Sequence, residues 1–332
     1  MTNKNKQNTD QEIVKLPDNE NMNNKNRLVI INGPTAVGKS KVAVELAKKI
    51  GGEIISADSM QVYRGMNIGT AKITHEETED IPHHLIDIID PDEEFGVMQF
   101  KELAENAVSE INARGKIPII CGGTGFYIQA VLYDIDFTEY DDEKASQIRK
   151  RLEVELEKNG SLYMFEKLMS IDPVYAGIIH PNNTKRLLHA LEFYELTGKK
   201  MSEHNIEQSQ NESPYDFRYF VLMDDRELIY DRINKRVDKM VAEGLPDEVR
   251  YLLDKGYDET LPSMLGIGYK EFVDYYKGRV SFNEAVDNIK RETRHYAKKQ
   301  ITWFKREKKV EYIDIREFGG AEKIACYIQS IL

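Results

Sequence analysis

The sequence predicts an α/β protein of the P-loop NTPase type, with a parallel sheet flanked by helices and a mostly helical insert. Short β-branched runs alternate with helical patterns in the first part of the chain, which is typical of a parallel sheet with helices on both faces. Each of these runs ends in a loop that carries glycine or aspartate. Since ligands bind beyond the carboxyl ends of the strands in such sheets, these loops are the predicted binding region.

The first strand and helix follow a polar N-terminal stretch. Residues 1–26 are rich in Asn and Lys and contain no apolar segment, so we expect a disordered tail rather than an export signal. Residues 27–32 form an apolar, β-branched run that predicts a buried strand. Residues 41–50 have apolar side chains at helical spacing and end at two glycines, which predicts a helix.

Two further strands and their helices complete the first part of the predicted core. Residues 53–57 predict the second strand, and residues 100–112 predict a helix with one apolar face. Residues 117–121 predict the third strand, and a glycine-rich turn leads from it into a helix over 126–132.

The pattern changes after residue 140. Residues 141–168 and 181–196 predict helices, whereas 202–215 is polar and predicts a loop. Residues 219–223 predict a strand that rejoins the sheet.

The remaining segments are mostly helical in pattern. Residues 226–254 predict a helix broken near Gly244 and Pro246, residues 282–303 predict a long helix, and 312–315 predicts a last strand. We therefore divide the chain into a tail (1–26), a first part of the core (27–140), a helical insert (141–215) and a return to the core with C-terminal helices (216–332).

Composition limits the class of protein. Hydrophobic residues make up 41% and charged residues 31% of the 332 residues, which is typical of a globular protein. No apolar run approaches the roughly 18 to 20 residues that a membrane helix needs. We expect a cytoplasmic protein with no membrane association, and a monomer. The two cysteines, Cys121 and Cys326, form neither a disulfide framework nor a zinc site by themselves.

Charge is distributed unevenly along the chain. The formal net charge is −11, which taken alone argues against a nucleic-acid partner. Residues 290–309 nevertheless hold nine Lys or Arg and only two acidic residues. Within this basic segment, cations flank the single tryptophan, Trp303, in a pattern that suits RNA phosphates and stacked bases. The alternative is a solvated helix face with Trp303 in the core.

A phosphate-binding loop follows the first strand. Its residues match G-x-x-x-x-G-K-[ST] and are Gly33, Pro34, Thr35, Ala36, Val37, Gly38, Lys39 and Ser40. Glycines let backbone N–H groups approach phosphates, the following helix adds its positive dipole end, and the lysine adds a charge. The hydroxyl of Ser40 can bind Mg²⁺. Taken alone, this loop favours ATP.

The loop after the second strand carries Asp58, where a carboxylate can bind Mg²⁺ or act as a base. The alternative is that Asp58 caps a helix. Gly65, Gly69 and Lys72 in the same loop suggest a phosphate-facing or hinge segment. His83 and His84 lack a third metal ligand and are expected to be structural.

Two further patterns contribute to the predicted site. The sequence GGTG at 122–125 is a second strand-to-helix turn that can present Thr124 and backbone donors to a substrate. Arg232 and Arg236 lie four residues apart on one helix face, where they can bind anionic oxygens or pair with nearby acids.

Together these motifs resemble the tRNA dimethylallyltransferase (isopentenyltransferase) family. The resemblance covers the chain after the tail and rests on GPTAVGKS (33–40), DSMQVYRGMNIGTAK (58–72), HHLID (83–87), GGTGFYIQAVL (122–132), NTKRLLHALE (183–192), RINKRVDKM (232–240), GIGYKE (266–271) and KKQITWF (298–304). The family transfers a dimethylallyl group from dimethylallyl diphosphate to N6 of the adenosine at position 37, beside the anticodon, in tRNAs that read codons beginning with U.

The resemblance implies roles for individual residues. Asp58 would be the base, Ser40 with Mg²⁺ would hold the diphosphate, and Arg236 would neutralise the leaving group. Gly33 to Ser40 and Arg232 would bind the diphosphate. The family's tRNA contacts would fall on Asp58, Ser59, Met60, Gln61, Thr124, Arg149, Asn183, Thr184, Lys185, Arg186, Leu187, Gly266, Ile267, Gly268, Tyr269, Lys270, Lys298, Lys299, Gln300, Ile301, Thr302, Trp303, Phe304 and Lys305. The insert would hold the anticodon stem-loop.

Two other functions fit parts of the sequence. A small-molecule kinase that phosphorylates a nucleoside or nucleotide would share the P-loop core, but the basic, tryptophan-bearing helix has no role in it. A nucleotide switch or RNA-binding module without chemistry would also share the core, although the chain has no N-K-x-D guanine motif.

Overall fold

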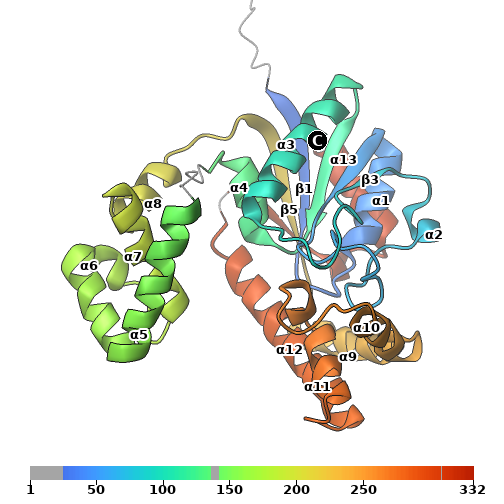
Figure 1. Cartoon of the computed structure of the whole chain (residues 1–332). Helices are drawn as coiled ribbons and strands as arrows, with labels where there is room; N and C mark the ends of the chain where they lie inside the picture. The colour runs from blue at the N-terminus through green and yellow to red at the C-terminus, as the bar shows by residue number, and fades with distance from the viewer. Residues whose placement is uncertain (1–24, 136–141, 308) are drawn as a thin grey trace, which may run out of the picture.

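A six-stranded parallel sheet forms the centre of the protein (Figure 1). The computed structural model describes residues 25–135, 142–307 and 309–332, so most of the predicted tail and residues 136–141 lie outside the described residues. The strand order is β3-β2-β4-β1-β5-β6. The strands are β1 (Asn26–Asn32), β2 (Gly52–Ala57), β3 (His83–His84), β4 (Ile117–Gly122), β5 (Tyr215–Met223) and β6 (Val310–Asp314).

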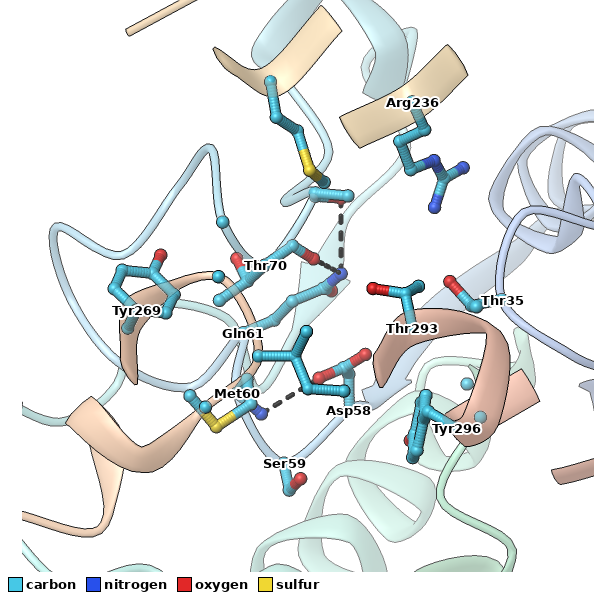
Figure 2. A pocket seen from close by; sticks show the side chains of 18 of the residues that line it. Thr35, Asp58, Ser59, Met60, Gln61, Thr70, Arg236, Tyr269, Thr293 and Tyr296 are labelled. Carbon is cyan, nitrogen blue, oxygen red and sulfur yellow. Dashed lines mark hydrogen bonds between the residues drawn. The ribbon is translucent and has the colours of Figure 1, made fainter. Parts of the chain in front are cut away.

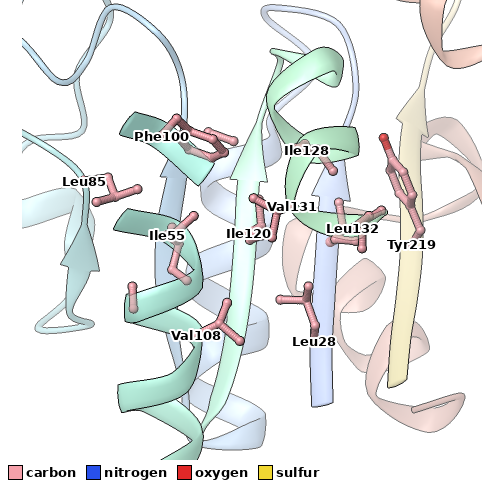
Figure 3. Close-up of a cluster of buried hydrophobic side chains, with 14 of the residues drawn as sticks. Leu28, Ile55, Leu85, Phe100, Val108, Ile120, Ile128, Val131, Leu132 and Tyr219 are labelled. Atoms are coloured by element: carbon pink, nitrogen blue, oxygen red, sulfur yellow. The ribbon is translucent and has the colours of Figure 1, made fainter. Parts of the chain in front are cut away.

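Helices cover both faces of the sheet because side chains alternate along its buried strands. Leu28 and Ile30 of β1 pack with α3 (Val97–Ala113) and α4 (Gly125–Leu132) on one face (Figure 3). Val29 and Ile31 pack with α1 (Lys39–Ile50) and α13 (Ala321–Ser330) on the other face. The predicted α/β fold with a flanked parallel sheet is confirmed.

In the described residues, the four helices between α4 and β5 pack around a hydrophobic cluster of their own. They are α5 (Asp142–Ile171), α6 (Pro173–Ala176), α7 (Thr184–Thr197) and α8 (Met201–Ser209), and Figure 1 shows them to one side of the sheet. Leu152, Leu187 and Leu191 are buried in this cluster.

The prediction of a loop over 202–215 is wrong at both ends of that segment. Residues 201–209 form α8, and β5 begins at Tyr215. The amide of Ser202 donates to Asp172 at 2.8 Å, and the ring of His204 lies 4.9 Å from that of Phe193. Tertiary contacts therefore order a segment whose polar composition favoured a loop.

A second group of helices lies beyond the carboxyl edge of the sheet. It contains α9 (Arg226–Ala242), α10 (Leu245–Asp254), α11 (Tyr269–Tyr276) and α12 (Phe282–Phe304). Their hydrophobic cluster also takes in Val62, Tyr63 and Met66, from the loop after β2. The predicted break near Gly244 is confirmed, because Gly244 has φ 101° and separates α9 from α10.

Short elements complete the described structure. They are α2 (His75–Thr78), η1 (Ser263–Leu265) and η2 (Ile315–Glu317). None of the helices in the described residues is long and apolar enough to pass through a membrane.

Candidate active site

A cavity of about 400 Å³ lies at the carboxyl ends of β1, β2 and β4. Helices α9 and α12 and the turn at 265–269 form its other walls. In Figure 2 the side chains of Asp58 and Arg236 point into the same space, close to Thr35 of the P-loop. An apolar part of the wall is made by Met60, Val237, Met240, Leu265, Ile267 and Ile289.

The predicted P-loop connects β1 to α1 and contributes one side of this cavity. Gly33 has to be glycine, because its φ is 150° and a Cβ would lie 2.6 Å from the backbone oxygen of Leu222. The Lys39 ammonium donates to the backbone oxygen of Pro34 at 2.9 Å. Burial lowers the pKa of Lys39 to about 8. An incoming phosphate would stabilise the charged form of this lysine.

Asp58 follows β2 and lies half-buried in the cavity wall. Its Oδ1 accepts from the Met60 amide at 2.9 Å, which fixes the carboxylate against the turn. No described helix begins at Asp58, so the helix-cap alternative is wrong. Burial raises the pKa of Asp58, although the hydrogen bond from Met60 and the charge of Lys39 oppose this. A raised pKa makes the carboxylate a better proton acceptor.

The two arginines of α9 differ, although they share one helix face as predicted. Arg232 donates from Nε to the backbone oxygen of Ala36 at 3.0 Å and pairs with Asp224. Arg236 lines the cavity and, within the described part of the chain, makes no hydrogen bond or ion pair. Burial lowers the pKa of its guanidinium. Arg236 is thus available to an anion, whereas Arg232 supports the P-loop from outside.

Gln300 of α12 connects the P-loop to the turn after β4. Its Oε1 accepts from the Thr35 amide at 2.8 Å, and its Nε2 donates to the Gly123 oxygen at 3.1 Å. A Cβ on Gly123 would lie 2.2 Å from Gln300, and a Cβ on Gly125 would lie 2.2 Å from Trp303. The close approach of α12 therefore explains two glycines of the GGTG turn.

Both ends of the loop at 58–72 line the cavity, and the loop is anchored by contacts with other segments. Of the residues that suggested a phosphate-facing or hinge loop, Gly69 lines the cavity, whereas Lys72 pairs with Asp87 at 2.6 Å and does not line it. The carboxylate of Glu248 accepts from the amides of residues 67–69 and from the Tyr269 hydroxyl. Sequence reasoning missed Glu248, which lies about 180 residues from the loop that it holds.

The residues suggested as tRNA contacts are spread over several elements of the fold. Lys270 lies on α11, and residues 298–305 lie at the end of α12, where the lysines are exposed but Gln300 and Phe304 are buried. Asp58, Ser59, Met60, Gln61 and residues 266–269 line the cavity, and Thr124 is the N-cap residue of α4, next to the cavity-lining Gly123. Residues 183–187 lie at the start of α7, in the α5–α8 group of helices. Arg149 of α5 belongs to the same group and pairs with Glu153 and Glu192.

Each histidine of the pair contacts a neighbouring segment, His83 the backbone oxygen of Ile81 and His84 the carboxylate of Glu53, which favours the structural role expected for them. His84 contacts Glu53 at 2.7 Å, and Glu53 also pairs with Arg114. The described residues contain no group of three His, Cys, Asp or Glu side chains that could hold a metal ion.

A second cavity, of about 810 Å³, separates the α5–α8 helices from the core. Phe126 and Trp303 line its core side, and Phe193 and His204 line its other side. Arg306 and Lys309 add positive charge at its wall. Sequence reasoning did not predict this cavity, because residues on its two sides are distant in the chain.

Known proteins resemble this chain over most of its length. The family model for IPP transferase matches residues 61–307. A tRNA dimethylallyltransferase of Lachnoclostridium phytofermentans is 53% identical over 92% of this chain and 97% of its own length. One from Alkaliphilus oremlandii is 47% identical over 91% of this chain and 95% of its own length.

Two solved structures of similarly named enzymes also resemble this chain. The tRNA isopentenylpyrophosphate transferase of Bacillus halodurans is 44% identical, with a TM-score of 0.68, over 92% of this chain and 96% of its own. A eukaryotic dimethylallyltransferase captured acting on tRNA is 32% identical, with a TM-score of 0.74, over 87% of this chain and 73% of its own. The family model spans the α9 and α12 walls of the cavity, two curated relatives near 50% identity cover more than nine tenths of the chain, and the chain belongs to the IPP transferase family of tRNA dimethylallyltransferases.

Proposed function

We propose that this protein transfers the dimethylallyl group from dimethylallyl diphosphate to N6 of adenosine 37, beside the anticodon, in tRNAs that read codons beginning with U. Diphosphate is released. The observation that carries this proposal is the single cavity in which Lys39, Asp58 and Arg236 meet an apolar wall. Polar groups for a diphosphate, a base for an amine and apolar cover for a five-carbon chain are thus side by side.

Departure of the diphosphate is the step that the P-loop assists. The bond between the allylic carbon and the diphosphate oxygen breaks, and negative charge grows on the leaving oxygen. Lys39 and Arg236 lie where they can stabilise that charge, and preorganised charges of this kind usually contribute the largest electrostatic effect. The apolar wall provided by Met240 and Ile289 covers the prenyl carbons and excludes water.

Formation of the new bond requires a base. The target adenine has to leave its stack to enter the cavity, which costs a few kcal/mol. Its N6 then attacks the allylic carbon, and Asp58 accepts the N6 proton as the C–N bond forms. The fixed position of the Asp58 carboxylate against Met60 suits this role.

A magnesium ion fits the residues at the start of α1. The exposed Ser40 hydroxyl lines the cavity, and Mg²⁺ commonly binds one or two protein oxygens together with phosphate oxygens and water. A bound Mg²⁺ would neutralise part of the diphosphate charge. Ser40 would orient the same oxygens by hydrogen bonding.

RNA would lie against α12 and the second cavity. Lys298, Lys299, Lys305 and Arg306 are exposed, and they form no ion pair within the ranges that the structure describes. Such cations suit the phosphates of RNA, while Phe126 and Trp303 offer rings for unstacked bases. The α5–α8 helices across this cavity would hold the anticodon stem-loop, with the protein acting as a cytoplasmic monomer.

A small-molecule kinase is the less favoured alternative. A kinase acceptor site would place a hydroxyl group in line with the phosphate, whereas this cavity presents an apolar wall beside the P-loop. The exposed cations of α12 would also have no function in a kinase.

A transfer assay tests the proposal. Incubating the protein with radiolabelled dimethylallyl diphosphate, Mg²⁺ and unmodified tRNA should move the label into tRNA, and digestion should place it on one adenosine. A parallel reaction with ATP and a nucleoside should give no phosphorylation. Absence of label from tRNA together with ATP-dependent phosphorylation would contradict the proposal.

A further inference from the structure

The buried face of α12 carries one polar side chain among apolar ones. Ala297, Gln300 and Phe304 are 0%, 5% and 0% exposed, and their spacing of three and four residues places them on one side of the helix. The neighbouring Lys298 and Lys299 are exposed on another side. One helix therefore presents cations outward and a single amide inward.

The side-chain amide of Gln300 contacts both the P-loop and the turn after β4. Its oxygen accepts from the Thr35 amide of the P-loop, and its nitrogen donates to the Gly123 oxygen after β4. Ala297 also belongs to the hydrophobic cluster that contains Ala36 of the P-loop. No other natural side chain of similar length and shape offers both an acceptor and a donor.

We propose that Gln300 is a positioning residue that couples RNA contact on α12 to diphosphate binding in the P-loop. This inference rests on the proposed function, because it takes α12 to be a helix that contacts RNA. RNA held on the outer face of α12 restrains Gln300, and Gln300 restrains the Thr35 end of the P-loop. Each substrate therefore finds the site partly ordered by the other, which makes the two bind cooperatively.

The main test replaces Gln300 with methionine, which keeps the length and removes both polar atoms. Binding of inorganic pyrophosphate is measured by calorimetry with and without an unmodified anticodon stem-loop. In the wild type, the stem-loop should tighten pyrophosphate binding severalfold, and pyrophosphate should tighten stem-loop binding by the same factor. In Gln300→Met, pyrophosphate alone should bind about tenfold more weakly, because two buried backbone groups lose their partner.

The coupling factor is the ratio of the pyrophosphate Kd without the stem-loop to the Kd with it. This factor distinguishes a positioning role of Gln300 from a purely structural one. It should fall close to one in Gln300→Met, while the stem-loop alone still binds within about twofold of the wild type. A variant that melts at a lower temperature but keeps the wild-type pyrophosphate affinity and coupling would overturn the proposal. A wild type with a coupling factor of one would also overturn it.

A second variant disturbs the contact between Gln300 and Gly123 by changing Gly123 instead of Gln300. Gly123→Ala places a Cβ within 2.2 Å of Gln300 Nε2 and should displace the amide. Its loss of coupling should be similar, and the double variant should lose little more than either single variant. If the losses of coupling in the two single variants add up fully in the double variant, the two residues do not act through one contact and the proposal is contradicted.

A matched control is available on α13. Gln329 donates from Nε2 to the backbone oxygen of Lys49, far from the cavity, so Gln329→Met should keep wild-type pyrophosphate affinity and coupling. Because these are binding measurements, they separate the two proposals. A wild-type protein that shows the coupling but transfers no prenyl group would contradict the proposed function and would still support the coupling role of Gln300.

Discussion

Replacing Asp58 with asparagine should lower the rate of prenyl transfer by about a thousandfold, because the amide cannot accept the N6 proton. Asparagine keeps an oxygen that can accept from the Met60 amide at the position of Oδ1. The turn after β2 should therefore keep its shape, and tRNA should bind within about threefold of the wild type. Single-turnover transfer and filter binding measure the two quantities separately.

The pH dependence gives a second readout for Asp58. Burial raises the pKa of this carboxyl, and the base has to be ionised, so the rate should fall as the pH falls through that raised pKa. The asparagine variant should lack this acidic limb. Asp258→Asn is the matched control, because Asp258 also accepts from a backbone amide two residues on, at Thr260, but lies outside the cavity. Transfer by Asp58→Asn within about tenfold of the wild type would exclude Asp58 as the base.

Replacing Arg236 with glutamine should reduce kcat by about a hundredfold to a thousandfold, which is typical when one stabilising group is lost from a developing anion. The cause is specific to Arg236, which lines the cavity and makes no hydrogen bond or ion pair within the described residues. Its whole charge is therefore available to the leaving diphosphate. Single-turnover rates at saturating dimethylallyl diphosphate measure this effect.

Two neighbouring variants on α9 sharpen the comparison. Arg232→Gln removes the contact with Ala36 and the pair with Asp224, so it should lower the melting temperature and diphosphate affinity more than kcat. Lys235→Gln removes an exposed cation that pairs with Asp231 and should leave transfer unchanged. Equal losses of kcat in the Arg236 and Arg232 variants would contradict the separate roles.

The parts of the fold that local sequence determines could be predicted. The run at 27–32 is apolar from Leu28 to Ile31, and β1 is buried from Leu28 onward. The long helix at 282–303 has a regular apolar stripe and is α12. The helix at 201–209 could not be predicted, because Asp172 and Phe193 order it from outside its own sequence.

In the candidate active site, too, the features set by local sequence could be predicted and those set by tertiary contacts could not. Lys39 and Asp58 could be predicted to face the cavity because both follow strand ends at one edge of the sheet. Arg232 and Arg236 could not be distinguished by spacing, because only the packed structure shows that Asp224 engages one of them. The contacts of Gln300 and Glu248 join segments far apart in the chain. Their roles depend on tertiary structure, which spacing does not encode.

The central claim is that the P-loop holds a leaving diphosphate rather than ATP, and the stoichiometry of the reaction tests it most directly. Released pyrophosphate and prenylated tRNA should be measured together in a reaction that contains dimethylallyl diphosphate, Mg²⁺ and tRNA but no ATP. One pyrophosphate should be released for each prenyl group transferred. A reaction that requires ATP, or that releases monophosphate in step with product, would contradict it.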